Sequence, residues 1–238
     1  MGIARQERYR REYAQLRPGW RDSLRLYRDL VRVSLPVGGR VLDLGCGHAN
    51  WLAPELAPAG LAAGLDPDLD ALRRNTSHRD RVVGTADDLP FADGRFDLVV
   101  NAWVFEHLER PEPAVGEMAR VLRPGGRLIF LTPNAWNYNV WLIRAVPNRL
   151  HDHFTRRLYG REEDDTYSVR YRLNTPRRLR QVLGAAGFRR SRLIFNPDPT
   201  YLSFGRHTFA LARALERLLD LGPLRQARVH LLGVYEKT

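Results

Sequence analysis

The chain has 238 residues, and its 44% hydrophobic content is enough to build the buried core of one large α/β domain. No apolar run reaches the roughly 20 residues of a membrane span, and the first residues lack the apolar centre of a secretory signal, so we expect one cytoplasmic domain spanning residues 1–238. The single cysteine, Cys46, excludes an internal disulfide and a cysteine-rich metal site, and we expect no bound metal.

The net charge of +11 is unevenly distributed. Residues 1–40 contain ten arginines and four acidic residues, and residues 41–132 contain nine arginines and fourteen acidic residues. Residues 133–238 contain eighteen arginines, one lysine and nine acidic residues. The middle of the chain is therefore acidic, and both flanks are basic. An arginine-rich solvated surface explains this pattern as well as an anionic partner does, such as a charged substrate, a membrane surface or a nucleic acid.

Residues 1–35 are expected to form a helical cap, because apolar residues such as Tyr9, Tyr13 and Tyr27 recur at helical spacing, with a break at Pro18-Gly19. Residues 36–132 then alternate apolar runs with helical patterns. These runs predict strands at 40–45, 61–66, 81–85, 96–103 and 126–132, and helices at 48–57, 68–74 and 113–122. Strands that alternate with helices at this pitch indicate a parallel sheet with helices on both faces.

Two insertions interrupt this alternation. Residues 133–173 are rich in Asn, Trp, Tyr, His and Arg and show no period, which is typical of a lid or a substrate-binding loop. Residues 174–238 form the C-terminal half, with a helix expected at 175–188, strands at 189–195 and 227–237, and a helical insertion at 197–226. Thr175 can cap the helix, and Gly187 suits its exit. The whole pattern predicts an α/β fold with a seven-stranded, mostly parallel sheet, a helical cap and two insertions.

The stretch VLDLGCG at 41–47 ends the first expected strand in a glycine turn. A Gly-x-Gly turn before a helix lets the backbone approach a ligand closely, and Asp66, at the end of the next strand, can accept hydrogen bonds from ribose hydroxyls. A nicotinamide dinucleotide domain explains these residues equally well. However, Asn50 replaces the third glycine of the dinucleotide pattern, and Asp43 suits a ligand with a cationic group.

Three further motifs decide between these cofactors: GTADDLPFADGRFDLVV at 84–100, VFEHL at 104–108 and VLRPGGRLIFLTPN at 121–134. In this order and spacing they resemble class I S-adenosylmethionine-dependent methyltransferases, in particular the small-molecule branch that includes the ubiquinone-biosynthesis methyltransferases. The resemblance is strong over residues 40–134 and weak over 175–195. It implies a Rossmann-like fold and S-adenosyl-L-methionine as the cofactor, with residues 36–132 as the cofactor-binding half.

The resemblance also implies which residues bind the cofactor. The methionine moiety would be lined by Asp43, Gly45, Cys46 and Gly47, and the ribose would be held by Asp66 with Pro67. The adenine would lie on the loop after the third strand, against Thr85, Ala86 and Asp87. Related sequences carry an aspartate where this chain has Thr85. The carbonyl of Asn101 would accept a hydrogen bond from the ammonium group of the cofactor.

Methyl transfer requires an aligned nucleophile and, for a protonated acceptor, a base. His107, just after the fourth strand, is the expected general base, with local packing as its alternative role. The candidates for substrate contact are aromatic or imidazole side chains at the same edge of the sheet or in the first insertion: Trp103, Tyr138, His151, His153, Tyr167 and Tyr171. A metal site at His151-x-His153 is not favoured, because such a pair in an arginine-rich loop is usually a surface feature.

We therefore expect an enzyme that transfers a methyl group to a small or medium-sized acceptor, at oxygen. The basic flanks favour an anionic acceptor, such as a phosphorylated, carboxylated or lipid-linked compound. The alternatives are a methyltransferase for RNA or protein, although no nucleic-acid-binding module is recognisable, and a non-catalytic cofactor-binding protein of the same fold. The basic amphipathic helices also allow peripheral contact with a membrane. The oligomeric state is left open by the sequence.

Overall fold

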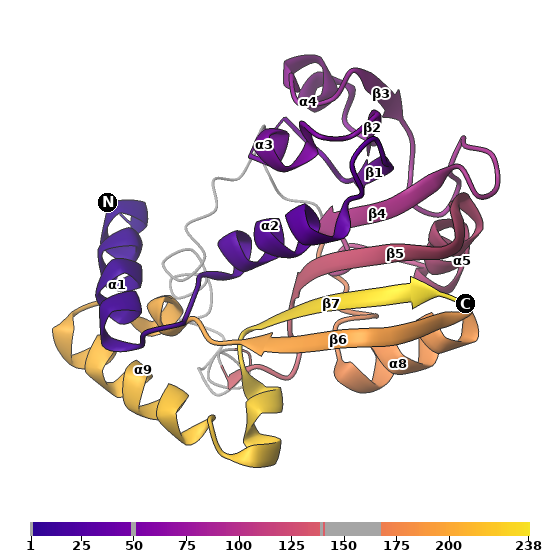
Figure 1. The fold of residues 1–238 in the computed structure, drawn as a ribbon. Helices are drawn as coiled ribbons and strands as arrows, with labels where there is room; N and C mark the ends of the chain where they lie inside the picture. The colour runs from indigo at the N-terminus through magenta and orange to yellow at the C-terminus, as the bar shows by residue number, and fades with distance from the viewer. Residues whose placement is uncertain (1, 49–50, 139, 141–167) are drawn as a thin grey trace. The chain divides into compact units, whose positions relative to one another are not determined.

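The computed structural model describes residues 2–48, 51–138, 140 and 168–238 (Figure 1). In this part of the chain seven strands form one sheet in the order β3-β2-β1-β4-β5-β7-β6. Their bounds are β1 Arg40–Leu44, β2 Leu61–Asp66, β3 Asp80–Val83, β4 Phe96–Ala102, β5 Leu122–Pro133, β6 Phe188–Asn196 and β7 His230–Lys237. The pairs β1–β2, β1–β4, β2–β3 and β4–β5 are parallel, whereas β7 runs opposite to β6 in Figure 1. The expected seven-stranded, mostly parallel sheet is confirmed.

The register of the central strands brings their carboxyl ends to one edge of the sheet. Leu44 of β1 lies opposite Leu65 of β2 and Asn101 of β4. Asp66 and Asn101 therefore flank the turn that leaves β1. In open α/β sheets, ligands bind at the carboxyl edge where the strand order reverses, and the order reverses here between β1 and β4.

Five α-helices accompany these strands: α2 Ser23–Ser34, α3 Ala53–Leu56, α4 Leu69–Arg74, α5 Pro111–Val121 and α8 Pro176–Ala185. The α8 helix begins and ends as its sequence predicts, because the Thr175 side chain accepts a hydrogen bond from the Arg178 amide and Gly187 follows with a φ of +81°. The Asp68 carboxylate caps α4 in the same way. No helix in the described ranges is both long and apolar enough to cross a membrane.

Two elements differ from the sequence-based expectation. The helix expected over 48–57 is limited to α3, which has Pro54 in its first turn and Pro58 just beyond its end; residues 49–50 lie outside the described residues. Strand β5 begins at Leu122 and not at 126, because Leu122 already pairs with Phe96. A register irregularity then separates this pair from the regular ladder.

The apolar core of the sheet is shared with α2. Val41, Val100 and Ile129 are fully buried on β1, β4 and β5, and they belong to one cluster with Tyr27 and Val31 of α2. Because α2 buries one apolar stripe against the sheet, this part of the expected N-terminal cap forms a helical layer of the α/β fold.

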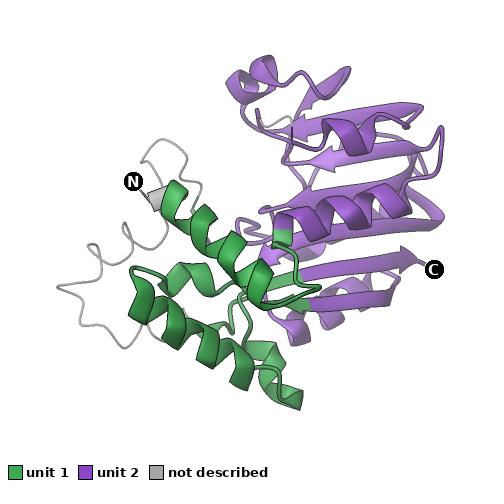
Figure 2. Ribbon diagram, turned by 60° about the vertical axis from the view of Figure 1, so that its left-hand side comes forward, with its two compact units in different colours: residues 1–23, 133–168, 195–231 green, residues 24–132, 169–194, 232–238 purple. Residues whose placement is uncertain are grey.

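The chain divides into two compact units (Figure 2). Unit 1 comprises residues 1–23, 133–168 and 195–231, and unit 2 comprises residues 24–132, 169–194 and 232–238. Among the described residues, the helices that lie mainly in unit 1 are α1 Gly2–Leu16, η2 Pro199–Leu202, α9 Arg206–Leu218 and η3 Gly222–Ala227. The expected cap is therefore divided, with α1 in unit 1 and nearly all of α2 in unit 2. The first helix, residues 133–138 of the first expected insertion and most of the second insertion contribute to one unit.

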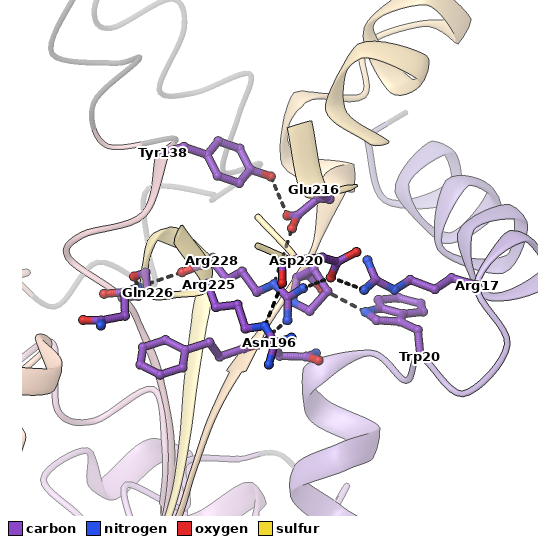
Figure 3. Close-up of polar contacts among 12 residues, drawn as sticks. Arg17, Trp20, Tyr138, Asn196, Glu216, Asp220, Arg225, Gln226 and Arg228 are labelled. Atoms are coloured by element: carbon purple, nitrogen blue, oxygen red, sulfur yellow. Dashed lines mark hydrogen bonds and ion pairs between the residues drawn. The ribbon is translucent and has the colours of Figure 1, made fainter. Parts of the chain in front are cut away.

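Unit 1 has its own core and a buried polar network (Figure 3). The rings of Tyr9 and Phe209 stack at a centroid distance of 4.5 Å. The Tyr138 hydroxyl donates to Glu216 Oε1 at 2.9 Å, and Arg228 Nε lies 4.0 Å from Glu216 Oε2. Burial raises the pKa of the Glu216 carboxyl to about 7. Residues far apart in the sequence thus form a packed unit with a titratable group at its centre.

Candidate functional site

The glycine turn after β1 is held from β2. The amide of Gly45 donates to Leu65 O at 2.7 Å, and the amide of Gly47 donates to Asp66 Oδ2 at 2.8 Å. Both glycines have a positive φ, +69° and +50°, which favours glycine. A Cβ atom on Gly45 would lie 2.4 Å from Val104 Cγ2, so only glycine fits there. The turn therefore presents bare backbone at the carboxyl edge of the sheet.

Asp66 is oriented by two backbone amides. Its Oδ2 accepts from Gly47, and its Oδ1 accepts from the amide of Asp68 at 2.9 Å, across Pro67. Each carboxylate oxygen can accept more than one hydrogen bond, so Asp66 keeps capacity for a ligand hydroxyl. This geometry fits the ribose contact that the sequence predicts.

Asp43 faces a partner that sequence reasoning missed. His78 Nε2 lies 3.3 Å from Asp43 Oδ2, and both side chains are buried. Burial raises the pKa of the Asp43 carboxyl, and His78 opposes this effect. In the sequence His78 is an isolated histidine before the third strand, and such a residue does not indicate by itself that it will contact Asp43.

Asn75 fixes the protonation of His78. Its Nδ2 donates to Gly47 O at 2.8 Å, and its Oδ1 accepts from the Ser77 amide at 2.9 Å. The same Oδ1 lies 3.1 Å from His78 Nδ1, so Nδ1 must carry a proton. The other ring nitrogen, Nε2, is the one that faces Asp43 Oδ2. Through Asn75, the Asp43–His78 pair is therefore tied to the glycine turn.

Two buried polar side chains next to this turn have no hydrogen-bond partner within the described residues. Asn101, at the end of β4, is fully buried, and neither its Nδ2 nor its Oδ1 is bonded. The hydroxyl of Tyr27 on α2 is in the same situation, and its pKa is raised by burial and by the negative charge of Asp43. An unsatisfied buried polar group costs about 1–3 kcal/mol. These groups fit a polar ligand bound over the turn, and Tyr27 was not predicted.

Cys46 is packed rather than reactive. It is 5% exposed, and burial raises the pKa of its thiol. A Cβ atom on Gly64 of β2 would lie 2.8 Å from Cys46 Sγ and 2.9 Å from His78 Cγ. The absence of a side chain at Gly64 therefore makes room for both residues under the glycine turn.

The loop after β3 holds the residues predicted to contact adenine. Thr85 pairs with Asp88 in a short antiparallel bridge that encloses Ala86. Asp87 forms an ion pair with Arg110 at 2.6 Å, and its pKa is lowered by hydrogen bonds from Thr85 and Arg110. The Asp87 carboxylate is thus already engaged, so an adenine contact by this loop stays a prediction.

Beyond β4, the chain places His107 beside a buried carboxyl group. His107 Nε2 lies 4.0 Å from Glu106 Oε1, and the His107 side chain is 23% exposed. Thr132 Oγ1 donates to Glu106 Oε2 at 3.0 Å, and Asn174 donates to Thr132. These three polar side chains are fully buried. Sequence reasoning singled out His107 from the motif VFEHL but missed its neighbour Glu106.

The substrate candidates occupy different environments. Trp103 is half-buried with a φ of +61°, and its amide donates to Leu131 O at 2.9 Å. Tyr171 is 36% exposed, and its amide donates to Glu106 O. Tyr138 is a buried residue of unit 1, bonded to Glu216. The other candidates, His151, His153 and Tyr167, lie outside the described residues. No group of three or more potential metal ligands occurs within the described ranges.

Unit 2 also contains a cavity of about 470 Å³ that includes none of the glycine-turn residues. It is lined by Glu109, Arg110, Pro111, Glu112, Pro113, Arg172 and Arg178. Arg172 donates to Glu109 O at 2.6 Å, and Arg178 forms an ion pair with Glu112. Arg110 is paired with Asp87, so Arg172 is the lining arginine that forms no salt bridge within the described residues, and its guanidinium group suits an anionic group.

Comparisons with known proteins match the part of the chain that contains the glycine turn and the central strands. A family model described as a methyltransferase domain matches residues 42–130. The fatty-acid O-methyltransferase of Mycolicibacterium smegmatis is 38% identical over 118 residues, which cover 46% of this chain and 43% of that protein. The demethylmenaquinone methyltransferase of Thermus thermophilus is 33% identical over 168 residues, which cover 63% of this chain and 74% of that protein. The match thus spans less than half of the first relative and most of the second.

A solved structure shares the fold. The geranyl diphosphate C-methyltransferase of Streptomyces coelicolor, in complex with Mg²⁺, geranyl diphosphate and S-adenosyl-L-homocysteine, has a TM-score of 0.61. The alignment covers 90% of this chain and 77% of that chain at 13% identity. At this identity the likeness establishes the sheet and its helices, and it carries no statement about the acceptor.

Proposed function

Since this chain belongs to the class I S-adenosylmethionine-dependent methyltransferases, we propose that it transfers a methyl group to the oxygen of a small or medium-sized anionic acceptor. One observation carries the proposal for the site: the fully buried, unbonded amide of Asn101 lies at the switch point of the sheet, opposite Leu44 at the start of the glycine turn. A polar ligand at this position would satisfy that amide.

The residues around the turn fit the cofactor. The methionine end would be held by Asn101, the Tyr27 hydroxyl and the backbone of 45–47, and the ribose by Asp66. When bound, S-adenosylmethionine supplies an electrophilic methyl group and a neutral thioether as leaving group. The Asp43–His78 pair, connected to Gly47 through Asn75, holds the turn in place, so that the turn would reorganise little when the cofactor binds.

An anionic acceptor reduces the demand for a base. A carboxylate oxygen is already deprotonated near neutral pH, so the chain needs to align it and to exclude water. The relative from Mycolicibacterium smegmatis is a fatty-acid O-methyltransferase, which supports an acceptor of this chemistry. Arg172 and Arg178, which line the cavity of unit 2, are the proposed contacts for the anion.

The proposal is tested in two steps with the full chain. Calorimetry should show binding of S-adenosylhomocysteine, and Asn101→Leu should weaken it. A methyl-transfer assay with labelled S-adenosylmethionine should then label a long-chain fatty acid and not its methyl ester. Absence of cofactor binding by folded protein would reject the whole proposal. Cofactor binding with transfer only to RNA, to protein or to an uncharged small molecule would reject the small anionic acceptor alone.

A further inference from the structure

Helix α9 and the following turn η3 present apolar side chains on two opposite sides. One side is buried within unit 1 and includes Phe209, Ala212 and Leu219. The opposite side carries four exposed leucines, Leu211 at 71%, Leu218 at 57%, Leu221 at 61% and Leu224 at 49% exposure. Leu211 and Leu218 are two helical turns apart and therefore share a face. A surface helix ordinarily exposes a polar face opposite its buried stripe, so this second apolar face calls for a partner.

The charges beside these leucines are positive. The same stretch carries Arg206, Arg213, Arg217 and Arg225, and none of the four forms a salt bridge within the described residues. Its two acidic residues are neutralised: Glu216 is buried against Tyr138, and Asp220 is ion-paired with Arg17 and Arg228. The exposed charge on this surface is therefore supplied by arginine.

A groove extends this surface toward α1, also within unit 1. It measures about 200 Å³ and is lined by Tyr13, Leu16, Arg17, Arg213, Arg217 and Asp220. Leu16 is half-exposed, and Arg213 lies 5.3 Å from the centre of the Phe209 ring, which restricts its guanidinium group. Three guanidinium groups against one carboxylate make the groove net positive, and guanidinium groups bind phosphate oxygens in pairs.

We propose that this docking face, formed by Leu211, Leu218, Leu221 and Leu224 with Arg213, Arg217 and Arg225, binds the surface of an anionic lipid bilayer. The leucines enter the boundary between headgroups and acyl chains, and the arginines contact lipid phosphates, which is how basic amphipathic helices bind membranes. Apolar side chains alone would suit another protein, whereas their combination with unneutralised arginines favours anionic lipid. This inference is independent of the proposed methyl transfer.

The test is co-sedimentation of the full chain with vesicles of phosphatidylcholine, with and without phosphatidylglycerol. We expect binding to the anionic vesicles, at least about tenfold weaker binding to the neutral ones, and weakening by salt. Leu211→Ser with Leu218→Ser should reduce binding about tenfold at unchanged charge, and Arg213→Glu with Arg217→Glu should abolish it. The matched controls are Leu69→Ser on α4 and Arg180→Glu on α8, which are exposed residues of unit 2 and should bind as the parent does.

Three results would overturn the inference: no binding of the parent chain to anionic vesicles, equal binding by the leucine variant, or loss of binding in the controls. Light scattering tests a fourth result. If the parent chain is a dimer that does not bind vesicles, and the leucine variant is a monomer, then a second copy of the chain covers this face and the inference is overturned. Should the Leu211 and Leu218 variant fail to fold by circular dichroism, Leu221→Ser with Leu224→Ser alters the same face beyond the helix.

Discussion

His78 Nε2 lies 3.3 Å from Asp43 Oδ2, and the opposite nitrogen of the same ring is bonded to Asn75, which also holds Gly47. The carboxylate at the end of β1 is therefore connected to the glycine turn through a side chain that comes from the segment before β3. An isolated buried carboxylate is costly, and His78 is the side chain that faces this one. We expect the pair to stabilise the fold and, through Asn75, the glycine turn.

His78→Ala should lower the free energy of unfolding by about 3 kcal/mol, because it leaves Asp43 buried without a partner. Adding Asp43→Asn should recover much of this loss, since the double variant no longer buries an unpaired charge. Urea unfolding of the two single variants and the double variant measures the coupling. The exposed His207→Ala serves as control and should change stability by less than about 0.5 kcal/mol. Additive losses in the double variant would mean that the two residues are not coupled.

Asn101→Leu should have opposite effects on the apoprotein and on ligand binding. Because the Asn101 amide has no hydrogen-bond partner within the described residues, an apolar side chain of similar size should leave the free apoprotein as stable or more stable. Affinity for S-adenosylhomocysteine should fall about tenfold or more, because the variant loses a hydrogen bond to the charged ammonium group of the ligand. Thermal unfolding with and without the ligand measures both effects.

The control for that experiment is a buried asparagine that is bonded. Asn134 donates to Gln226 O and Arg228 O, so Asn134→Leu should destabilise the protein in the absence of ligand. A similar loss of stability in Asn101→Leu would show that its amide is satisfied in solution by something other than the cofactor.

The sequence predicted the parts of the fold that local chemistry determines. Thr175 and Gly187 mark the ends of α8, and the run of Arg40–Leu44 into Gly45 marks both a strand and a turn, because caps and positive φ values have residue-specific signals. The positions of Asp66 and Asn101 at one edge followed from the alternation of strands and helices. These signals span few residues, and a single sequence contains them completely.

Contacts between distant segments had no such signal. The Asp43–His78 pair depends on strand register, since Asp43 lies opposite Gly64 and the missing side chain at Gly64 leaves room for the imidazole. Unit 1 depends on pairs such as Tyr9 with Phe209, which are 200 residues apart. Periodicity predicted each helix, but it could not indicate which helices would pack together.

Glu216 should make the stability of unit 1 fall with rising pH. Its pKa is about 7 in the folded protein because of burial, against about 4.5 in the unfolded chain. The folded state therefore binds a proton that the unfolded state has lost, so the contribution is complete below pH 4.5 and disappears as the pH rises through 7. Urea unfolding between these values should show a slope that Glu216→Gln removes and that Glu7→Gln, on the surface of α1, retains. If the free energy of unfolding of Glu216→Gln still falls with pH at the same slope, a group other than Glu216 causes the pH dependence.

His107→Ala distinguishes an ionised from a protonated acceptor. With a fatty acid as acceptor we expect kcat to fall less than about tenfold, because no proton must be removed from a carboxylate. The loss for an essential general base would be about 10²–10⁴. Measurement of kcat across the pH range completes the test. A large loss that is relieved at high pH would establish His107 as the base and would exclude an acceptor that is already deprotonated.

The arginine-lined cavity of unit 2 should determine acceptor affinity. Arg172→Glu with Arg178→Glu reverses two of its charges and should raise KM for an anionic acceptor at least about tenfold, while affinity for S-adenosylhomocysteine stays unchanged. Because Arg178 also pairs with Glu112, Arg178→Glu alone could act by disturbing α5, and Glu112→Gln controls for the loss of that pair. Arg177→Glu with Arg180→Glu, two exposed residues of α8, changes the net charge by the same amount outside the cavity. A rise in KM equal to that of this control would indicate long-range electrostatics, whereas a larger rise that weakens with added salt would place the anion next to Arg172 and Arg178.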